Sequence, residues 1–219
     1  MLTSGLRLIF LLALMAPFQA LKAQDDWREG THYFTIPGAS DETGDHVSVN
    51  EIFSYACPHC NDFQPFIVPW HAALSADIDF KRTPAVFNRS WEPYARAYLT
   101  LETMGQPEVL HAAIFKALHN ERRPLRTIDD LATFAAEHGI DRDRFLSTAK
   151  SFTVETRLRQ SQQQVARWGI TGTPSLVVAG RYRIAAGGAL ATYNDMLRIA
   201  DWLIARERKR RGLDAAPAE

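Results

Sequence analysis

Three short stretches before residue 85 are rich in strand-forming residues, and apolar and polar side chains alternate most clearly in the second. They are HYFTIPG at 32–38, VSVNEIFSYA at 47–56 and DIDFKRTP at 77–84. Strict alternation is typical of β-strands, because successive side chains point to opposite faces. The second stretch places Val47 and Phe53 on the same side. We therefore expect three strands in this part of the chain.

A helical pattern follows the second of these strands. Apolar residues recur there at spacings of three and four, at Phe63, Phe66, Ile67, Trp70 and Leu74. Pro65 and Pro69 fall inside the pattern, and each removes a backbone N–H donor from a helix. We expect a helix here that is kinked or broken.

A long helical block extends over residues 91–168, for which the pattern predicts three to five helices. Pro107 suits the first position of one of them, where a missing N–H costs nothing. Thr127, with Asp130 three residues later, suits the N-cap of another.

Two further strands follow the helical block, at residues 175–178 and 181–184, and Ala179-Gly180 between them predicts a tight hairpin. A last amphipathic helix follows Thr192. Its apolar face is formed by Met196, Ile199, Leu203 and Ile204. The order of elements predicts an α/β fold whose sheet is assembled from two chain segments, with a helical insertion between them.

A short apolar run near the N-terminus, Leu8 to Phe18, follows Arg7 and precedes small residues, which is the layout of a secretory signal peptide. The run is shorter than the roughly 20 residues that span a membrane, and a retained anchor is the alternative. We expect a signal peptide over residues 1–23. Cleavage is expected after Ala23, with Ala20 as the second candidate.

The net charge of the chain is close to zero, with 25 basic and 25 acidic residues. Loss of residues 1–23, which hold two of the basic residues, would leave a net charge of −2. This balance gives no electrostatic reason to expect a nucleic acid partner. The basic run at 206–212 fits the C-terminus of the last helix, whose dipole favours cations. We expect a flexible tail at residues 211–219.

The only two cysteines stand three positions apart, in the sequence Cys57-Pro58-His59-Cys60 at a strand-to-helix junction. The N-terminus of a helix stabilises an anion, so Cys57 is expected to be the nucleophilic thiolate. Cys60, one turn into the helix, would be more buried and react second. We expect His59 to stabilise the Cys57 anion further and Pro58 to fix the loop.

Other interpretations of the cysteine pair remain open from the residues alone. A zinc site would need two more ligands, and the spacing of His111 and His119 does not match the usual pattern. An inert structural disulfide would close too small a ring to stabilise the chain much. We expect no metal and no bound cofactor.

A carboxylate on the second strand is a further candidate. Glu51 shares a strand face with Val47, Val49 and Phe53, and a buried unpaired carboxylate is costly unless it is protonated. It is either a proton acceptor for Cys60, or a strand-edge residue in water or paired with Lys81. For Thr173-Pro174, which enters a later strand, the local sequence does not decide between a cis and a trans bond.

The motifs NEIFSYACPHC at 50–60 and GITGTPSLVVAGRY at 169–182, separated by a helical insertion, resemble those of the DsbA-type thiol:disulfide oxidoreductases of the bacterial periplasm. The similarity extends from about Trp27 to Arg208. It implies a thioredoxin-like fold with an inserted all-α domain. The thioredoxin-like domain would comprise residues 24–85 and 160–210, and the helical insertion residues 86–159.

The same resemblance implies roles for residues of the site. Thr173-Pro174 would be cis and lie against the Cys57-Cys60 disulfide, with Thr173 offering backbone hydrogen bonds to an extended substrate. Glu51 would match the buried acid that shuttles the proton of Cys60, and Pro65 a helix-kinking proline. Several strongly oxidising members of the family carry Val at the position of Thr173. This difference concerns how strong an oxidant the protein is, and it does not change the expected chemistry.

The resemblance predicts a periplasmic enzyme that donates its Cys57-Cys60 disulfide to reduced exported proteins. A quinone-linked membrane oxidase of the DsbB type would reoxidise it, and we expect a monomer. The alternatives are a disulfide isomerase or reductase, and a periplasmic peptide-binding chaperone whose disulfide is incidental.

Overall fold

The computed structural model describes residues 26–39 and 44–213. The expected signal peptide with both cleavage positions, and residues 214–219 of the expected tail, lie outside these ranges. Within the described ranges, no helix has the length and apolar character that a membrane span requires.

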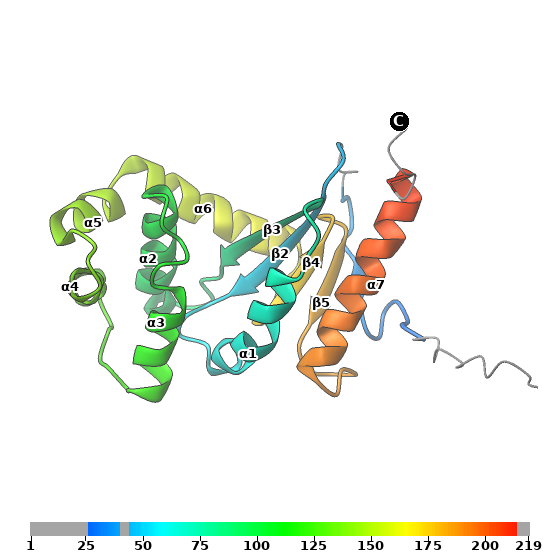
Figure 1. The fold of residues 1–219 in the computed structure, drawn as a ribbon, viewed down its shortest axis with the longest axis horizontal. Helices are drawn as coiled ribbons and strands as arrows, with labels where there is room; N and C mark the ends of the chain where they lie inside the picture. The colour runs from blue at the N-terminus through cyan, green and yellow to red at the C-terminus, as the bar shows by residue number, and fades with distance from the viewer. Residues whose placement is uncertain (1–25, 40–43, 214–219) are drawn as a thin grey trace, which may run out of the picture.

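A five-stranded mixed sheet forms the centre of the fold (Figure 1). Its strands are β1 (Phe34–Thr35), β2 (Val47–Phe53), β3 (Ile78–Pro84), β4 (Ser175–Val178) and β5 (Tyr182–Ala185), in the order β1-β5-β4-β2-β3. Only the β2–β3 pair is parallel. The prediction that the sheet combines an early and a late chain segment is confirmed, because β2 pairs with β3 on one side and with β4 on the other.

Helices α1 (Pro58–Ala72) and α7 (Tyr193–Arg211) pack on one face of this sheet. Their apolar side chains, among them Phe63 and Met196, form one buried cluster with Val49 and Ile184 of the strands. The four residues predicted for the inner face of α7 are buried. The opposite face is covered in part by the end of α6, whose side chains pack with Ile52.

The helical insertion lies between β3 and β4 and gathers beyond the β3 edge of the sheet in Figure 1. It contains a 3₁₀ turn (Arg89–Trp91), α2 (Glu92–Thr103), α3 (His111–Phe115), a π-helical turn (Lys116–Asn120), α4 (Ile128–Glu137), α5 (Arg142–Ala149) and α6 (Phe152–Arg167). The expected boundary between residues 159 and 160 falls inside α6, which continues across it without a break.

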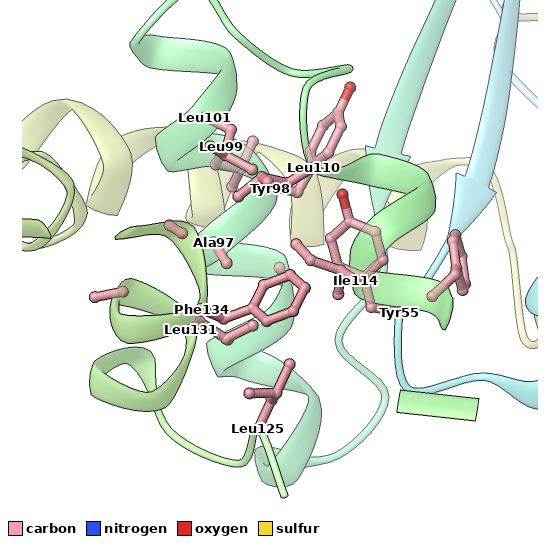
Figure 2. Close-up of a cluster of buried hydrophobic side chains, with 14 of the residues drawn as sticks. Tyr55, Ala97, Tyr98, Leu99, Leu101, Leu110, Ile114, Leu125, Leu131 and Phe134 are labelled. Atoms are coloured by element: carbon pink, nitrogen blue, oxygen red, sulfur yellow. The ribbon is translucent and has the colours of Figure 1, made fainter. Parts of the chain in front are cut away.

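The insertion and the sheet share a core. Phe53 and Tyr55, from the end of β2 and just beyond it, belong to the same buried cluster as Leu131 and Phe134 of α4. Figure 2 shows the Tyr55 ring beside Ile114 within this cluster. The two parts of the chain are therefore packed together as one body at the end of β2.

Three local predictions differ from the structure. The first strand is only Phe34–Thr35, although Ile36 continues toward β5 through a 2.7 Å bond from its N–H to the Arg181 carbonyl. Pro107 does not begin a helix: residues 107–110 form turns, and α3 begins at His111. Helix α1, which was expected to be kinked or broken at its prolines, is not broken.

Helix α1 continues through Pro65 and Pro69. Both prolines are exposed, so the carbonyls that lose their N–H partners can bond to water instead. Phe63 and Ile67 on the opposite side are fully buried against the sheet and α7. Burial of that face compensates for the missing hydrogen bonds.

Turn chemistry was predicted correctly at the hairpin, and cap chemistry was predicted correctly at Thr127. Ala179 and Gly180 both have positive φ, as a two-residue hairpin turn of this type requires. Thr127 and Thr192 each cap a helix through a reciprocal capping box with the aspartate three residues later.

Candidate active site

The two cysteines lie at the junction between the end of β2 and the start of α1, and both belong to the buried cluster shared with the insertion. Cys57 is the N-cap of α1, with an extended backbone, and Pro58 occupies the first turn. Both cysteines are free thiols; Cys57 retains 5% exposure, whereas Cys60 has none. Cys57 is therefore the more accessible of the two cysteines.

The surroundings shift the pKa values of the two thiols in opposite directions. Hydrogen bonding from the Cys60 side chain, from Thr173 and from the backbone N–H groups of Cys60 and His59 lowers the pKa of Cys57 to about 5, although burial opposes this. Burial raises the pKa of Cys60, and the adjacent Cys57 charge raises it further. Near neutral pH, Cys57 is a thiolate and Cys60 a thiol.

The peptide bond between Thr173 and Pro174 is cis, as the family resemblance implied. It precedes β4 directly and brings the Thr173 carbonyl oxygen to 3.4 Å from the Cys57 sulfur. Residues 116 positions apart thus meet at the thiol. The contact places Thr173 next to any group that reacts with Cys57.

His59 contributes to the site through its backbone. Its N–H helps to stabilise the Cys57 thiolate, and its carbonyl oxygen accepts a 3.1 Å hydrogen bond from the Tyr193 hydroxyl. The side chain is 74% exposed, with its Nδ1 4.0 Å from the Asp62 carboxylate.

Glu51 is completely buried and paired. Its Oε2 accepts a 2.9 Å hydrogen bond from Nε of Arg82, which lies on the neighbouring strand β3. Pairing with Lys81 is therefore wrong, since Lys81 bonds to Asp79 instead. In parallel strands Glu51 stands opposite Arg82, whereas Lys81 is one position earlier and points to the other face.

Burial raises the pKa of Glu51 above its usual value, and Arg82 offsets only part of that effect. Arg82 is itself shared, because it also bonds to Glu108 from the helical insertion. Gln64 connects the acid to the cysteine helix: its amide nitrogen lies 3.5 Å from Glu51 Oε1 and 3.3 Å from the Cys60 carbonyl oxygen. Glu51 is thus a buried acid that the Gln64 side chain connects to the backbone of Cys60.

Two histidines of the insertion, His111 and His119, contact Tyr55 just before Cys57, and these contacts were not predicted from the sequence. The Tyr55 hydroxyl and His111 Nδ1 are 3.0 Å apart, and His119 Nε2 lies 2.7 Å from the Tyr55 carbonyl oxygen. Burial lowers the pKa of His111 well below its usual value, so this imidazole is neutral. No local signal marks these residues, because their partner is more than 50 positions away in the sequence.

A cavity of about 320 Å³ opens beside His59 and Thr173. It is lined by His59, Thr173, Ala186, Gly187, Leu190, Ala191, Thr192 and Tyr193. A larger polar cavity of about 760 Å³ lies against the other face of the sheet, and neither cavity is lined by a cysteine. Among the described residues, no group of three or more His, Cys, Asp or Glu side chains is arranged to hold a metal ion.

Comparison with known proteins gives consistent matches. The model of the DSBA-like thioredoxin domain family matches residues 67–197. Thiol:disulfide interchange protein DsbA of Pseudomonas aeruginosa is 37% identical over 206 residues, which are 93% of this chain and 97% of the relative. The protein of the same name from Azotobacter vinelandii is 40% identical over 162 residues, which are 74% of this chain and 75% of the relative.

Solved structures agree with these relatives. The crystal structure of Pseudomonas aeruginosa DsbA is similar with a TM-score of 0.80 at 36% identity, covering 86% of this chain and 98% of that one. The oxidoreductase NmDsbA1 from N. meningitidis has a TM-score of 0.71 at 22% identity, over 84% of this chain and 96% of its own, and shares the fold.

Proposed function

The chain belongs to the DSBA-like thioredoxin domain family and is a thiol:disulfide oxidoreductase, and we propose that it donates a Cys57-Cys60 disulfide to reduced proteins after their export. The observation that carries the proposal is the opposite protonation of two adjacent thiols beside the cis Thr173-Pro174 bond. Such a pair favours the reduced enzyme and hence the transfer of the disulfide to the client.

The reaction is two thiol-disulfide exchanges. A client thiolate attacks the Cys57 sulfur, a client–Cys57 bond forms, and the Cys57–Cys60 bond breaks so that the Cys60 sulfur leaves with the electron pair. A second client thiolate then attacks the client sulfur of the mixed disulfide and releases Cys57 as a thiolate. The client loses two electrons and gains a disulfide, while the enzyme ends as the dithiol.

The driving force lies in the Cys57 thiolate. With its pKa lowered to about 5, this sulfur is a good leaving group in the second exchange and remains ionised afterwards. Each unit of pKa depression corresponds to about 1.4 kcal/mol in favour of the thiolate. The backbone N–H groups at the start of α1, including that of His59, supply part of this stabilisation, and Pro58 fixes the turn that presents them.

Glu51 supplies a proton to the Cys60 sulfur when it leaves and accepts that proton when the dithiol is reoxidised. Its raised pKa supports this role, because the acid must hold a proton near neutral pH to give one. Gln64 and the helix backbone separate Glu51 from Cys60, and a water molecule would complete the path.

An extended client segment is expected to bind along Thr173 and Pro174, whose backbone lies beside Cys57. The 320 Å³ cavity next to Thr173 would take a client side chain. The proposed setting is the periplasm, reached through the expected signal peptide. A quinone-linked DsbB-type membrane oxidase would reoxidise a monomeric enzyme at the same surface.

The proposal is tested with two cysteine variants and non-reducing gels of a reduced client. Cys57→Ser is expected to abolish client oxidation, whereas Cys60→Ala, once activated as a mixed disulfide with glutathione, is expected to accumulate client cross-links through Cys57. Cross-links that persist in a Cys57→Ser/Cys60→Ala variant, or none with Cys60→Ala, would contradict it.

Two measurements separate the alternatives. A reduction potential near −270 mV, as for thioredoxin, rather than near −120 mV would favour an isomerase or reductase. A Cys57→Ser/Cys60→Ser variant that still suppresses aggregation of clients would favour a peptide-binding chaperone.

A further inference from the structure

Arg82 on β3 is bound by two carboxylates that come from different parts of the fold. Its Nε donates a 2.9 Å hydrogen bond to Glu51 on β2, and its Nη1 donates to a carboxylate oxygen of Glu108 in the insertion. The guanidinium also lies over the Phe80 ring, 5.3 Å from its centroid. A guanidinium carries a single positive charge, so Arg82 cannot neutralise both carboxylates.

The two carboxylates differ in their access to water. Glu51 has no exposed surface, whereas the side chain of Glu108 is 61% exposed. Ionisation of a carboxyl group costs much more free energy inside a protein than in water, so the pair ionises first at Glu108. The charge on Glu108 then makes the ionisation of Glu51 harder still, because like charges share one cation. The arrangement therefore favours a proton on Glu51.

The segment before α3 places Glu108 next to Arg82, although 26 positions separate them in the sequence. Residues 107–110 form turns, and the Glu108 carbonyl oxygen accepts a 3.3 Å hydrogen bond from the His111 N–H at the start of α3. The insertion thus supplies one of the two carboxylates, and β2 supplies the other.

The other titratable side chains that interact with these charges are neutral near pH 7, and they are Tyr55, Tyr98, His71 and His111. Burial raises the pKa values of the two tyrosines and lowers those of the two histidines. Gln64 of α1 also contacts Glu51 and carries no charge. Burial raises the pKa of Glu51, Arg82 lowers it, and Glu108 acts against Arg82.

We propose that Glu108 is a positioning residue for the disulfide reaction: by taking part of the charge of Arg82, it keeps Glu51 in the protonated form that can give a proton to Cys60. The proposal rests on the proposed function, because it concerns the acid that serves Cys60. It adds a residue of the insertion to the groups that set the proton chemistry of the site.

The test is Glu108→Gln, which keeps an oxygen acceptor for Arg82 and removes only the charge. The ¹³C resonance of the Glu51 carboxyl carbon, assigned by its loss in Glu51→Gln, is followed against pH in the reduced protein. With one like charge removed, the acid dissociation constant of Glu51 is expected to rise about tenfold. The pH at which Cys60 attacks a Cys57–glutathione disulfide at half its maximal rate is expected to fall by about one pH unit.

Glu155→Gln is the matched control. Glu155 is a 41% exposed carboxylate of the insertion, and it shares the largely buried Arg96 with Glu92 through contacts of 2.8 Å each. This variant also removes one charge from an arginine that binds two carboxylates, but the second carboxylate there is Glu92 and not Glu51. It is expected to leave the Glu51 titration unchanged. Urea unfolding establishes that each variant is folded before titration.

The outcomes separate the proposal from the proposed function. A Glu51 titration that is the same in Glu108→Gln as in the wild type, or that moves equally in Glu155→Gln, would overturn the proposal. A Glu51→Gln variant whose Cys60 step keeps the wild-type rate would instead contradict the proton role given to Glu51 in the proposed function, because the carboxyl titration does not depend on that rate.

Discussion

Cys57 and Cys60 are chemically identical side chains three positions apart, and their surroundings make them behave differently. Cys57 stands at the helix terminus among hydrogen-bond donors, whereas Cys60 lies one turn further in and is fully buried. Desolvation determines the pKa of a thiol that has few hydrogen-bond donors around it, and hydrogen bonding determines the pKa where several donors converge on the sulfur. The direction of electron flow at this site follows from that difference of one helical turn.

Glu51 offers a prediction at the same scale. Glu51→Gln keeps a side chain of the same shape next to Arg82 and Gln64 but removes the ionisable group. We expect Cys60 to attack a glutathione mixed disulfide at Cys57 about 10²-fold more slowly, because the acid no longer accepts its proton. Stopped-flow kinetics measures this rate, and the Cys57 titration should change far less.

Glu207→Gln is the control for this variant. Glu207 is also fully buried and pairs with Arg210, but it lies on α7 and not on the strand before the cysteines. It is expected to lower stability without slowing the Cys60 step. Equal slowing in both variants would mean that Glu51 acts through stability and not as a proton acceptor.

At the scale of elements, the site depends on where helices begin. Helix α1 begins at Pro58, directly behind Cys57, and α7 begins at Tyr193, whose hydroxyl reaches His59. Each start is set by local chemistry, by proline in the first turn of α1 and by the Thr192 capping box of α7. The caps therefore contribute to the geometry of the site as well as to the stability of the helices.

Removal of one cap gives a measurable change. The Thr192 hydroxyl accepts a 3.1 Å hydrogen bond from the Asp195 N–H, and Thr192→Ala removes it. We expect the free energy of unfolding to fall by about 1 kcal/mol in urea titrations. Thr171→Ala, at an exposed position outside any helix, is expected to cost much less. Equal losses would show that the cap is not responsible.

At the scale of the whole molecule, the insertion and the sheet meet in one core at the end of β2. The Phe53 ring lies 5.1 Å from Tyr98, 5.2 Å from His111 and 6.2 Å from Phe115, all of which come from the insertion. The same cluster contains both cysteines. We infer that the redox motif is held by the packing between the two parts of the chain.

Phe53→Ala tests this coupling. Phe53 has no exposed surface, and its loss is expected to lower the free energy of unfolding by about 3–5 kcal/mol. Hydrogen exchange should show protection falling together in β2 and in α4, because both depend on the shared core. Phe152→Ala is the control, since that ring is 80% exposed. Loss of protection confined to the sheet would contradict a shared core.

The sequence by itself determined the local chemistry of this protein. Alternation located β2, the Thr127-Asp130 pair located the start of α4, and Ala179-Gly180 located the hairpin. These features depend on neighbours within a few residues, so they can be read directly. The cysteine pair and its place before a helix were visible for the same reason.

The tertiary structure alone decided which distant residues complete the site. Arg82 rather than Lys81 pairs with Glu51, because the register of parallel β2 and β3 places Arg82 opposite it on the buried face. Tyr193 meets His59 only because α7 packs beside α1. Strand register and helix packing depend on the burial of whole faces of strands and helices, so they cannot be predicted from a few neighbouring residues. The thiol motif was therefore readable in the sequence, whereas the groups that tune it became visible only in the fold.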